Sequence, residues 1–530
     1  MVSYKRLATC YFLVLLLMFI CAFRVCAIMR EEKYASAAEN ERTRTVTLNH
    51  IRGTVFDCNM ERITNANNTV YAVIFDKPAA IATLYNYFSL PQTEKIISEI
   101  KSNGFAVRTI SQKTDCDGIY CFNAMVHADD SLAAKHIIGY ADENGKGVCG
   151  IEQAYDSLLC GNGDNTVTFT LDGQGKILQG EEPILSYDYS AENCGVKLTI
   201  DTKIQQIAEQ SAVSINCGAV VITEISTGKI RAMVSRPDYK ISDLSAALKN
   251  KDEPLLNRVL CTYNIGSVFK PYVVAAGLEN GMDMITDCTG YTDVDGLLFG
   301  CHNTGGHGRV DMEAAIKYSC NSFFYKYIQV VGAGRVYSLA KKAGFESSVY
   351  LAPGISSRAG SLGSVAAENM SARALANMSI GQGELLLSPL ALSNIYAAIA
   401  SGGSYKTPWL VEGKVKNGDI FDKETSPAEV KVMSKKTAAK LKVALASVLE
   451  KGGTGEKGRP SAVSAGGKTG TAQTGVVKNG KKVTNSWFCG FFPLENPKYT
   501  VTVLSENSAG GCSSVFAKIT DAVTEYETVK

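Results

Sequence analysis

The sequence has almost no net charge, because 54 lysine and arginine residues are balanced by 52 aspartate and glutamate residues. Proteins that bind nucleic acid usually concentrate basic residues on one face. The composition therefore gives no electrostatic reason to expect nucleic acid as a partner. Internal repeats and low-complexity tracts are also missing from the 530 residues, which are enough for two or three domains with a large core.

The apolar N-terminus lacks a clear cleavage site. Lys5 and Arg6 precede an apolar run from Leu7 to Phe23, which resumes after Arg24. The run is at the lower limit of what spans a bilayer, with Arg24 able to snorkel, and the positive charges before it predict a cytoplasmic N-terminus. A cleaved signal peptide is the alternative, but no small-x-small site clearly follows the run. We expect residues 1–29 to form a short tail and a retained membrane anchor, with the rest of the chain outside the membrane.

The sixteen cysteines suggest a disulfide framework in an exported protein. However, Cys10, Cys21 and Cys26 lie in or beside the membrane segment, and the other thirteen are scattered singly, mostly beside apolar residues. A domain of this size does not need disulfides for stability, so buried free thiols are the favoured interpretation. Cys116 and Cys121 are the one pair close enough in sequence to suggest a bridge.

Candidate metal ligands are also few. Cys301 and His302 with His307 resemble part of a metal cluster, but a fourth ligand is not evident. We predict no metal and no cofactor. Cys320 is expected to be packed rather than reactive, because neighbouring residues alternate between faces.

Local patterns divide the rest of the chain in two. Residues 30–44 are charged and predict an exposed stalk, residues 46–56 predict strands, and residues 70–190 mix short strands with helices and show no catalytic constellation. From about Leu198 the pattern changes to a helix, a β-hairpin at residues 218–235, a long helical region, three strands and a last helix. Strands at both ends of this region predict an antiparallel sheet whose first and last strands pair. The predicted strands are residues 468–474, 486–492 and 499–505, and the main predicted helices are 267–280, 311–331, 389–400, 435–451 and 513–528.

The stretch Gly266-Ser267-Val268-Phe269-Lys270 carries the first chemical signal. A serine three residues before a lysine lies on the same helix face, and the positive end of the helix lies near the serine oxygen. This arrangement can activate a nucleophile. The spacing alone is weak, since three other serines share it, but only Ser267 is expected to begin a helix behind a glycine. The other three serines are Ser98, Ser226 and Ser338.

Two further motifs follow in order. Ser319-Cys320-Asn321 lies in the predicted helix 311–331, and Lys468-Thr469-Gly470-Thr471 opens a predicted strand. Taken singly, each has an ordinary structural interpretation: Ser267 as a helix cap, Asn321 as a polar helix residue, Lys468 as a solvated strand end. Serine-x-x-lysine, serine-x-asparagine and lysine-threonine-glycine in this order form the set found in penicillin-binding proteins and serine β-lactamases.

Over nearly its whole length the sequence resembles a class B penicillin-binding protein. In that family an Arg-Gly-x-x-x-Asp pattern opens the pedestal, matched here by Arg52, Gly53 and Asp57, although Cys58 and Met60 stand where arginine and glycine are usual. Gly381-Gln382-Gly383 also matches a family segment. The resemblance implies an α+β (α/β) fold class: a transpeptidase domain with a central antiparallel sheet flanked by helices at 216–530, an α+β stalk and pedestal at 30–215, and the single N-terminal transmembrane helix.

The resemblance also implies a peptidoglycan D,D-transpeptidase. Ser267 would attack a D-Ala-D-Ala terminus to form an acyl-enzyme, and Lys270 would be the base if Lys468 and the helix dipole lower its pKa. Ser319 would pass a proton to the leaving amine, and Asn321 would offer an amide to the substrate backbone. Lys468, Thr469 and Thr471 would bind the terminal carboxylate, and Gly470 would let the strand approach the ligand closely. The backbone N–H groups of Ser267 and Thr471 would form the oxyanion hole.

Other functions stay open at this point. A D,D-carboxypeptidase or β-lactamase would pass the acyl group to water, although a secreted β-lactamase would lack the anchor and pedestal. A penicillin sensor or inactive scaffold would be acylated without turnover. The expected partners are peptidoglycan stem peptides, β-lactams as covalent inhibitors, the membrane, and a membrane-embedded glycan polymerase in cell-shape, division or sporulation machinery.

Overall fold

The computed structural model describes residues 4–30, 42–178, 180–187, 194–363, 370–478 and 480–530. The predicted stalk lies mostly outside the described residues. Helix α1 (Tyr4–Arg30) has 27 residues, a hydropathy of 2.7 and no buried residue, so it is long and apolar enough to cross a membrane. The chain divides into two compact units, one of residues 1–51, 68–125 and 161–190, which includes α1, and the other of residues 52–67, 126–160 and 191–530. Segments of the two units alternate along the chain, so they do not test the predicted domain boundary at residue 215. That boundary stays a prediction.

Besides α1, the described residues of the first unit form two small sheets and two helices. Its sheets have the strand orders β1-β6-β7 and β4-β3-β5. A core between the strands includes Val73 and Phe169, both fully buried, and Phe75 and Phe169 meet edge to face with ring centroids 5.2 Å apart. The bounds are β1 (Thr43–Arg52), β3 (Asn67–Phe75), α3 (Pro78–Leu84), α4 (Leu90–Asn103), β4 (Phe105–Ile110), β5 (Ile119–Val126), β6 (Cys160–Thr170) and β7 (Ile184–Ser186).

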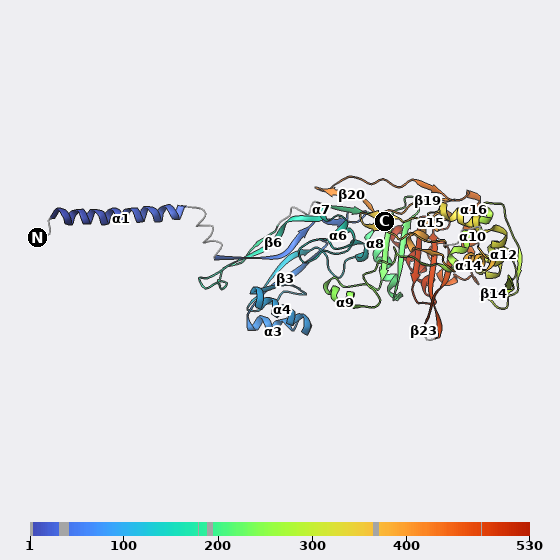
Figure 1. Cartoon of the computed structure of the whole chain (residues 1–530), viewed down its shortest axis with the longest axis horizontal. Helices are drawn as coiled ribbons and strands as arrows, with labels where there is room; N and C mark the ends of the chain where they lie inside the picture. Colours follow the sequence, from blue (N-terminus) through green and yellow to red (C-terminus); the bar gives the residue numbers. More distant parts are fainter. Residues whose placement is uncertain (1–3, 31–41, 179, 188–193, 364–369, 479) are drawn as a thin grey trace. The chain divides into compact units, whose positions relative to one another are not determined.

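The second unit is built on a five-stranded sheet with the order β10-β9-β25-β24-β23. Its strands are β9 (Gly218–Glu224), β10 (Ile230–Arg236), β23 (Gly466–Lys478), β24 (Lys481–Phe492) and β25 (Tyr499–Ser505). All pairings are antiparallel, and the early strand β9 pairs with the late strand β25. Figure 1 shows the green early strands beside the red late ones. The predicted pairing of the first and last strands is therefore confirmed.

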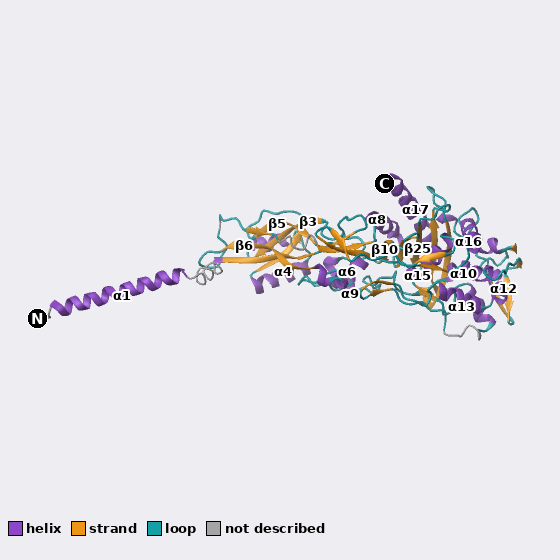
Figure 2. Ribbon diagram, turned by 90° about the horizontal axis from the view of Figure 1, so that it is seen from above, coloured by secondary structure: helices purple, strands orange, loops and turns teal. Residues whose placement is uncertain are grey.

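Helices cover both faces of this sheet. α8 (Thr202–Ser211) and α17 (Cys512–Val529) pack on one face, with buried residues such as Ile204 and Phe516. α15 (Pro389–Ala400), buried along its whole length, packs on the other, as Figure 2 shows. Since a sheet this apolar must be shielded on both sides, the three layers follow from the sequence. The remaining helices are α5 (Lys135–Ile138), α6 (Gly150–Ala154), α7 (Asp156–Leu159), α9 (Leu244–Lys249), α10 (Lys270–Leu278), α11 (Met312–Lys317), α12 (Asn321–Val331), α13 (Ala333–Lys342), α14 (Ala372–Ser379) and α16 (Lys435–Ser447).

Smaller strands complete the second unit. A four-stranded sheet has the order β2-β8-β20-β21, and the others form two-stranded ribbons. Their bounds are β2 (Thr54–Phe56), β8 (Cys194–Leu198), β11 (Tyr263–Asn264), β12 (Thr286–Cys288), β13 (Tyr291–Val294), β14 (Leu297–Gly300), β15 (Gly308–Val310), β16 (Tyr350–Ala352), β17 (Ile355–Ser356), β18 (Leu386–Leu387), β19 (Ser404–Lys406), β20 (Val411–Lys416), β21 (Asp419–Phe421) and β22 (Glu429–Lys431).

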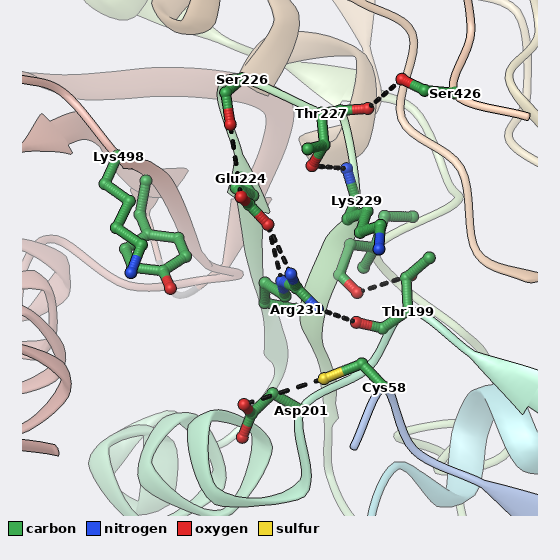
Figure 3. Close-up of polar contacts among 12 residues, drawn as sticks. Cys58, Thr199, Asp201, Glu224, Ser226, Thr227, Lys229, Arg231, Ser426 and Lys498 are labelled. Atoms are coloured by element: carbon green, nitrogen blue, oxygen red, sulfur yellow. Dashed lines mark hydrogen bonds and ion pairs between the residues drawn. The ribbon is translucent and has the colours of Figure 1, made fainter. Parts of the chain in front are cut away.

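A polar network links the four-stranded sheet to the central one (Figure 3). Arg231 of β10 donates from Nε to Glu224 Oε2 at 3.0 Å and from Nη1 to the Thr199 carbonyl at 3.1 Å. Cys58, which stands where arginine is usual, lies 3.9 Å from Asp201 Oδ2, and burial raises its pKa to about 12. Cys58 is therefore a neutral thiol. Arg231 supplies a positive charge beside Glu224, and Lys530, whose Nζ lies 3.6 Å from Asp201 Oδ2, supplies another.

One predicted helix is wrong. Residues 311–331 form two helices, α11 and α12, because the chain breaks at Ser319, whose φ is 53°. The amide of Cys320 still donates to the Ala315 carbonyl at 2.9 Å. The break turns the carbonyl and hydroxyl of Ser319 toward a buried lysine of α10, a tertiary contact that local sequence does not predict.

Candidate active site

The predicted nucleophile lies in a tight turn against strand β23. Residues Gly266–Phe269 form a 3₁₀ turn that continues directly into α10. Gly266 has φ 61°, and a Cβ there would lie 2.5 Å from the Thr471 carbonyl oxygen. Only glycine meets both conditions. The indole of Trp487 donates to the Asn264 carbonyl at 3.0 Å and fixes the start of the turn, so Ser267 is presented by a rigid frame.

Lys270 is fully buried at the first position of α10. Its Nζ lies 2.7 Å from the Ser319 carbonyl oxygen, 3.0 Å from Ser319 Oγ and 2.6 Å from Asn321 Oδ1. It also lies 5.1 Å from the ring centroid of Phe324. The structure therefore brings together residues that are about fifty positions apart in the sequence.

The orientation of Asn321 follows from this contact. Because Oδ1 accepts from Lys270, the Nδ2 group is left as a hydrogen-bond donor, and Asn321 lines the cleft described below. The neighbouring Cys320 is fully buried, as predicted.

The lysine-threonine-glycine motif forms the start of edge strand β23, which borders the turn. A Cβ on Gly470 would lie 2.9 Å from both the Ile265 carbonyl oxygen and Val268 Cγ1. The sequence suggested that this glycine admits a ligand; in the structure it admits the turn that carries the nucleophile. Thr469 Oγ1 donates to Thr454 Oγ1 at 3.1 Å.

These elements line one cleft of about 1010 Å³. Its wall includes Ser267, Ser319 and Asn321 together with Thr469, Gly470 and Thr471. Lys270 and Lys468 lie behind this wall, with both side chains fully buried. The eight predicted site residues thus come together, six at the surface of the cleft and two beneath it.

The two buried lysines have depressed pKa values. Burial lowers the pKa of Lys270 to about 7, although the thiols of Cys320 and Cys301 act in the opposite direction. Burial and the charge of Lys270 lower the pKa of Lys468 well below its usual range. The sequence analysis gave Lys468 and the helix dipole as the cause of a low Lys270 pKa, whereas burial is the main cause.

Some residues of the cleft were not predicted to act there. Gln382 joins the turn region to β23: its Nε2 donates to the Thr471 carbonyl at 3.2 Å, and its Oε1 accepts from the Gln473 amide at 3.2 Å. The Gly-Gln-Gly segment was a signal for this residue. Thr454 and Tyr325 also line the cleft, and no local pattern marks them, because tertiary packing alone brings them there.

Comparisons with known proteins agree with this geometry. Residues 218–525 match the family described as the penicillin binding protein transpeptidase domain. Stage V sporulation protein D of Bacillus subtilis is 28% identical over 417 residues, covering 75% of this chain, and the chain spans 62% of that relative's length. Peptidoglycan D,D-transpeptidase PbpA of Mycolicibacterium smegmatis is 30% identical over 392 residues, covering 69% of this chain and 76% of the relative.

A solved structure shows the same fold. Penicillin-binding protein PBP2 from Helicobacter pylori has a TM-score of 0.69 at 21% identity and covers 91% of this chain and 99% of its own. The same fold occurs in the solved complex of that protein with MreC. The family match covers more than half of the chain. The chain therefore belongs to the class B penicillin-binding proteins, the peptidoglycan D,D-transpeptidases, and residues 218–525 form its transpeptidase domain.

Proposed function

We propose that this chain cross-links peptidoglycan stem peptides through an acyl-enzyme on Ser267. The observation that carries the proposal is the buried Nζ of Lys270, held by Ser319 and Asn321 one turn after a serine that faces the cleft. Ser267 Oγ attacks the carbonyl of the penultimate D-alanine as its proton passes to Lys270 Nζ. The hydroxyl of Ser319 relays a proton to the departing amine of the last D-alanine.

The backbone around the cleft supports stabilisation of the oxyanion. Gly266 packs against Thr471, so the amides of Ser267 and Thr471 belong to neighbouring segments at the cleft wall. We assign the oxyanion hole to these two N–H groups, which are held by secondary structure and need not reorganise during the reaction. The hydroxyls of Thr469 and Thr471 bind the terminal carboxylate of the peptide, with Lys468 behind them.

The second half-reaction decides between the candidate enzymes. In a transpeptidase the amine of a second stem peptide attacks the acyl-enzyme, whereas in a carboxypeptidase or β-lactamase water does so. The polar cleft of about 1010 Å³ has room for a donor and an acceptor peptide, which favours transfer to an amine. α1 supports a single-pass anchor with the N-terminus in the cytoplasm and the catalytic domain outside. That location suits a partner glycan polymerase in the membrane.

The first experiment tests the nucleophile. Ser267→Ala should abolish covalent labelling by a fluorescent penicillin, whereas Ser98→Ala and Ser338→Ala, which have the same spacing to a lysine, should label like the parent chain. Labelling that persists in Ser267→Ala would overturn the assignment.

The second experiment tests the acceptor. The full-length chain in detergent is given a stem-peptide donor with and without an amine acceptor, and products are separated by mass. Cross-linked dimer is the expected product. Free tetrapeptide alone, with the acceptor present, would favour the hydrolase alternatives, and acylation without any product would favour a sensor.

A further inference from the structure

Glu506 lies where three segments of the second unit meet. It is the first residue after β25, and its backbone amide donates to the Cys217 carbonyl at 2.8 Å. Its carboxylate accepts from Arg258 Nε at 2.9 Å, in an ion pair whose arginine side chain is 4% exposed and whose glutamate side chain is 17% exposed. Neither residue is among the described residues that line the cleft. Glu506 can therefore act on the cleft only through the segments that it joins.

Arg258 is a fixed anchor for this carboxylate. Its Nη1 donates to the Glu253 carbonyl at 2.9 Å, and its Nη2 donates to the Asp252 carbonyl at 2.7 Å. Its backbone amide donates to Ser235 Oγ at 3.1 Å. A planar guanidinium that is held in this way cannot turn to follow a displaced carboxylate, so it determines where Glu506 lies.

The same carboxylate contacts the segment that carries the nucleophile. It accepts a hydrogen bond from the Tyr263 hydroxyl, and burial, with the charge and hydrogen bond of Glu506, raises the pKa of Tyr263 above its usual range. The hydroxyl therefore stays a donor. The ring of Tyr263 meets that of Trp487 with centroids 6.2 Å apart, and the nucleophile turn Gly266–Phe269 follows closely in the chain.

Glu506 also begins a loop that forms another part of the cleft wall. Residues 509–511 of this loop line the cleft, as do the first two residues of α17. The Ser508 amide donates to the Thr484 carbonyl at 2.8 Å, which holds the middle of the loop to β24. The start of the loop is held by the amide and the carboxylate of Glu506. The position of this part of the wall therefore depends on Glu506.

We propose that Glu506 is a positioning residue that fixes the separation between the nucleophile turn and the loop 506–511, and thereby the binding of ligands long enough to touch both. The inference rests on the proposed function, since it concerns ligands that acylate Ser267. The bonds of Lys270 to the serine-x-asparagine motif do not involve Glu506. Loss of Glu506 should therefore weaken the binding of a long ligand and leave the chemistry of acylation nearly unchanged.

Acylation kinetics of the full-length chain in detergent test this role. Acylation by a fluorescent penicillin is followed at increasing ligand concentrations, which separates the apparent dissociation constant from the limiting rate constant. Glu506→Ala should raise the dissociation constant about tenfold and change the limiting rate constant by less than about threefold. 6-Aminopenicillanic acid lacks an acyl side chain and so has less to touch at the second wall. Its dissociation constant, measured by competition, should rise by less than about twofold.

Two further variants keep part of the contacts of Glu506. Glu506→Gln keeps an acceptor of the same shape for Arg258 Nε and should restore most of the affinity. Tyr263→Phe removes only the bond to the nucleophile segment and leaves the ion pair in place. It should raise the dissociation constant for the fluorescent penicillin about threefold. Because the buried arginine keeps its partner, Tyr263→Phe tests the positioning role even if Glu506→Ala does not fold.

Glu224 offers the matched control. It pairs with Arg231, the two side chains are 14% and 16% exposed, and its carboxylate accepts from Arg231 Nε at 3.0 Å (Figure 3). Glu224 lies opposite Tyr499 at the start of β25, whereas Glu506 follows the end of that strand. The two ion pairs thus lie at opposite ends of one pair of strands. Glu224→Ala should lose thermal stability as Glu506→Ala does and still bind both ligands like the parent chain.

The outcomes that would overturn the proposal are distinct. One is an unchanged dissociation constant for the fluorescent penicillin in folded Glu506→Ala or Tyr263→Phe, and another is an equal loss for the long and the short ligand. A loss of affinity in Glu224→Ala as large as that in Glu506→Ala would assign the effect to stability alone. A failure of the proposed function differs from all of these, because the chain would then still be labelled after Ser267→Ala.

Discussion

Lys270 combines full burial with three polar contacts, and this environment determines when it can accept a proton. Its pKa is lowered to about 7, mainly by burial. A general base must be neutral, and a group with this pKa is mostly charged below pH 7 and mostly neutral above it. Acylation should therefore become faster as pH rises through the pKa of Lys270.

We predict that the second-order rate constant for acylation by penicillin rises about tenfold per pH unit below about pH 7 and levels off above it. The measurement is the rate of fluorescent-penicillin labelling across this range, with thermal unfolding followed at each pH to confirm that the chain stays folded. A flat profile would remove Lys270 from the role of base.

Gly470 allows a second test at a single residue. A methyl group there would lie 2.9 Å from a backbone oxygen and from Val268 Cγ1, so Gly470→Ala must push β23 away from the nucleophile turn. We expect about 1–3 kcal/mol of lost stability and slower acylation. Gly334→Ala, in helix α13 with open space around the added methyl, is the control and should be neutral or stabilising. If the two variants had the same stability and the same acylation rate, the contact between Gly470 and the nucleophile turn would not be tight.

At the scale of elements, long apolar segments were predicted well from the sequence. The limits of β25 and α15 agree with the predicted strand and helix, because a run such as Tyr499–Ser505 or Pro389–Ala400 is buried along its whole length and has strong local signals at its ends. Ser388, for example, caps α15 by accepting from the Ala391 amide. The pairing of β9 with β25 also followed from the order of elements.

The break at Ser319 could not be predicted in the same way. The sequence on both sides favours a helix, and the interruption is stabilised by the contact with Lys270, about fifty residues away. The proximity of the Cys288 and Cys320 thiols could not be predicted from the sequence either, because it arises only when β12 and α12 have packed. Motif order was enough to name the eight site residues, whereas their division between the cleft wall and the layer behind it needed the tertiary structure.

Arg52, the first residue of the Arg-Gly-x-x-x-Asp pattern, belongs to a buried network of ion pairs. Arg52 is almost fully buried and donates to Glu152 Oε2 at 2.8 Å and to Asp156 Oδ1 at 2.9 Å, and Glu152 also bonds to His127 at 2.7 Å. This network connects residues 52–67 with residues 126–160 inside the second unit.

We predict that Arg52→Ala lowers the free energy of unfolding by about 3–5 kcal/mol, because it leaves the buried carboxylate of Glu152 without its arginine partner and with His127 alone. Lys77→Ala is the control: it breaks an ion pair with Asp117 in which both side chains are about half exposed, and should cost less than about 1 kcal/mol. Denaturant titration measures both. A similar, small cost for the two variants would show that Arg52 serves another purpose than stability.

For the whole molecule, anchoring and catalysis are expected to be separable. No residue of α1 is buried against the rest of the chain, while every predicted catalytic residue belongs to the second compact unit with its own core. A chain that begins at residue 42 therefore loses apolar surface that only a membrane can cover and loses no packing around Ser267. We expect this chain to leave the membrane fraction and to be acylated by penicillin within about twofold of the full-length rate in detergent. Fractionation and labelling measure the two properties on the same sample. A large fall in the acylation rate, with unchanged thermal unfolding, would contradict the separation and would mean that α1 influences the cleft in the intact protein.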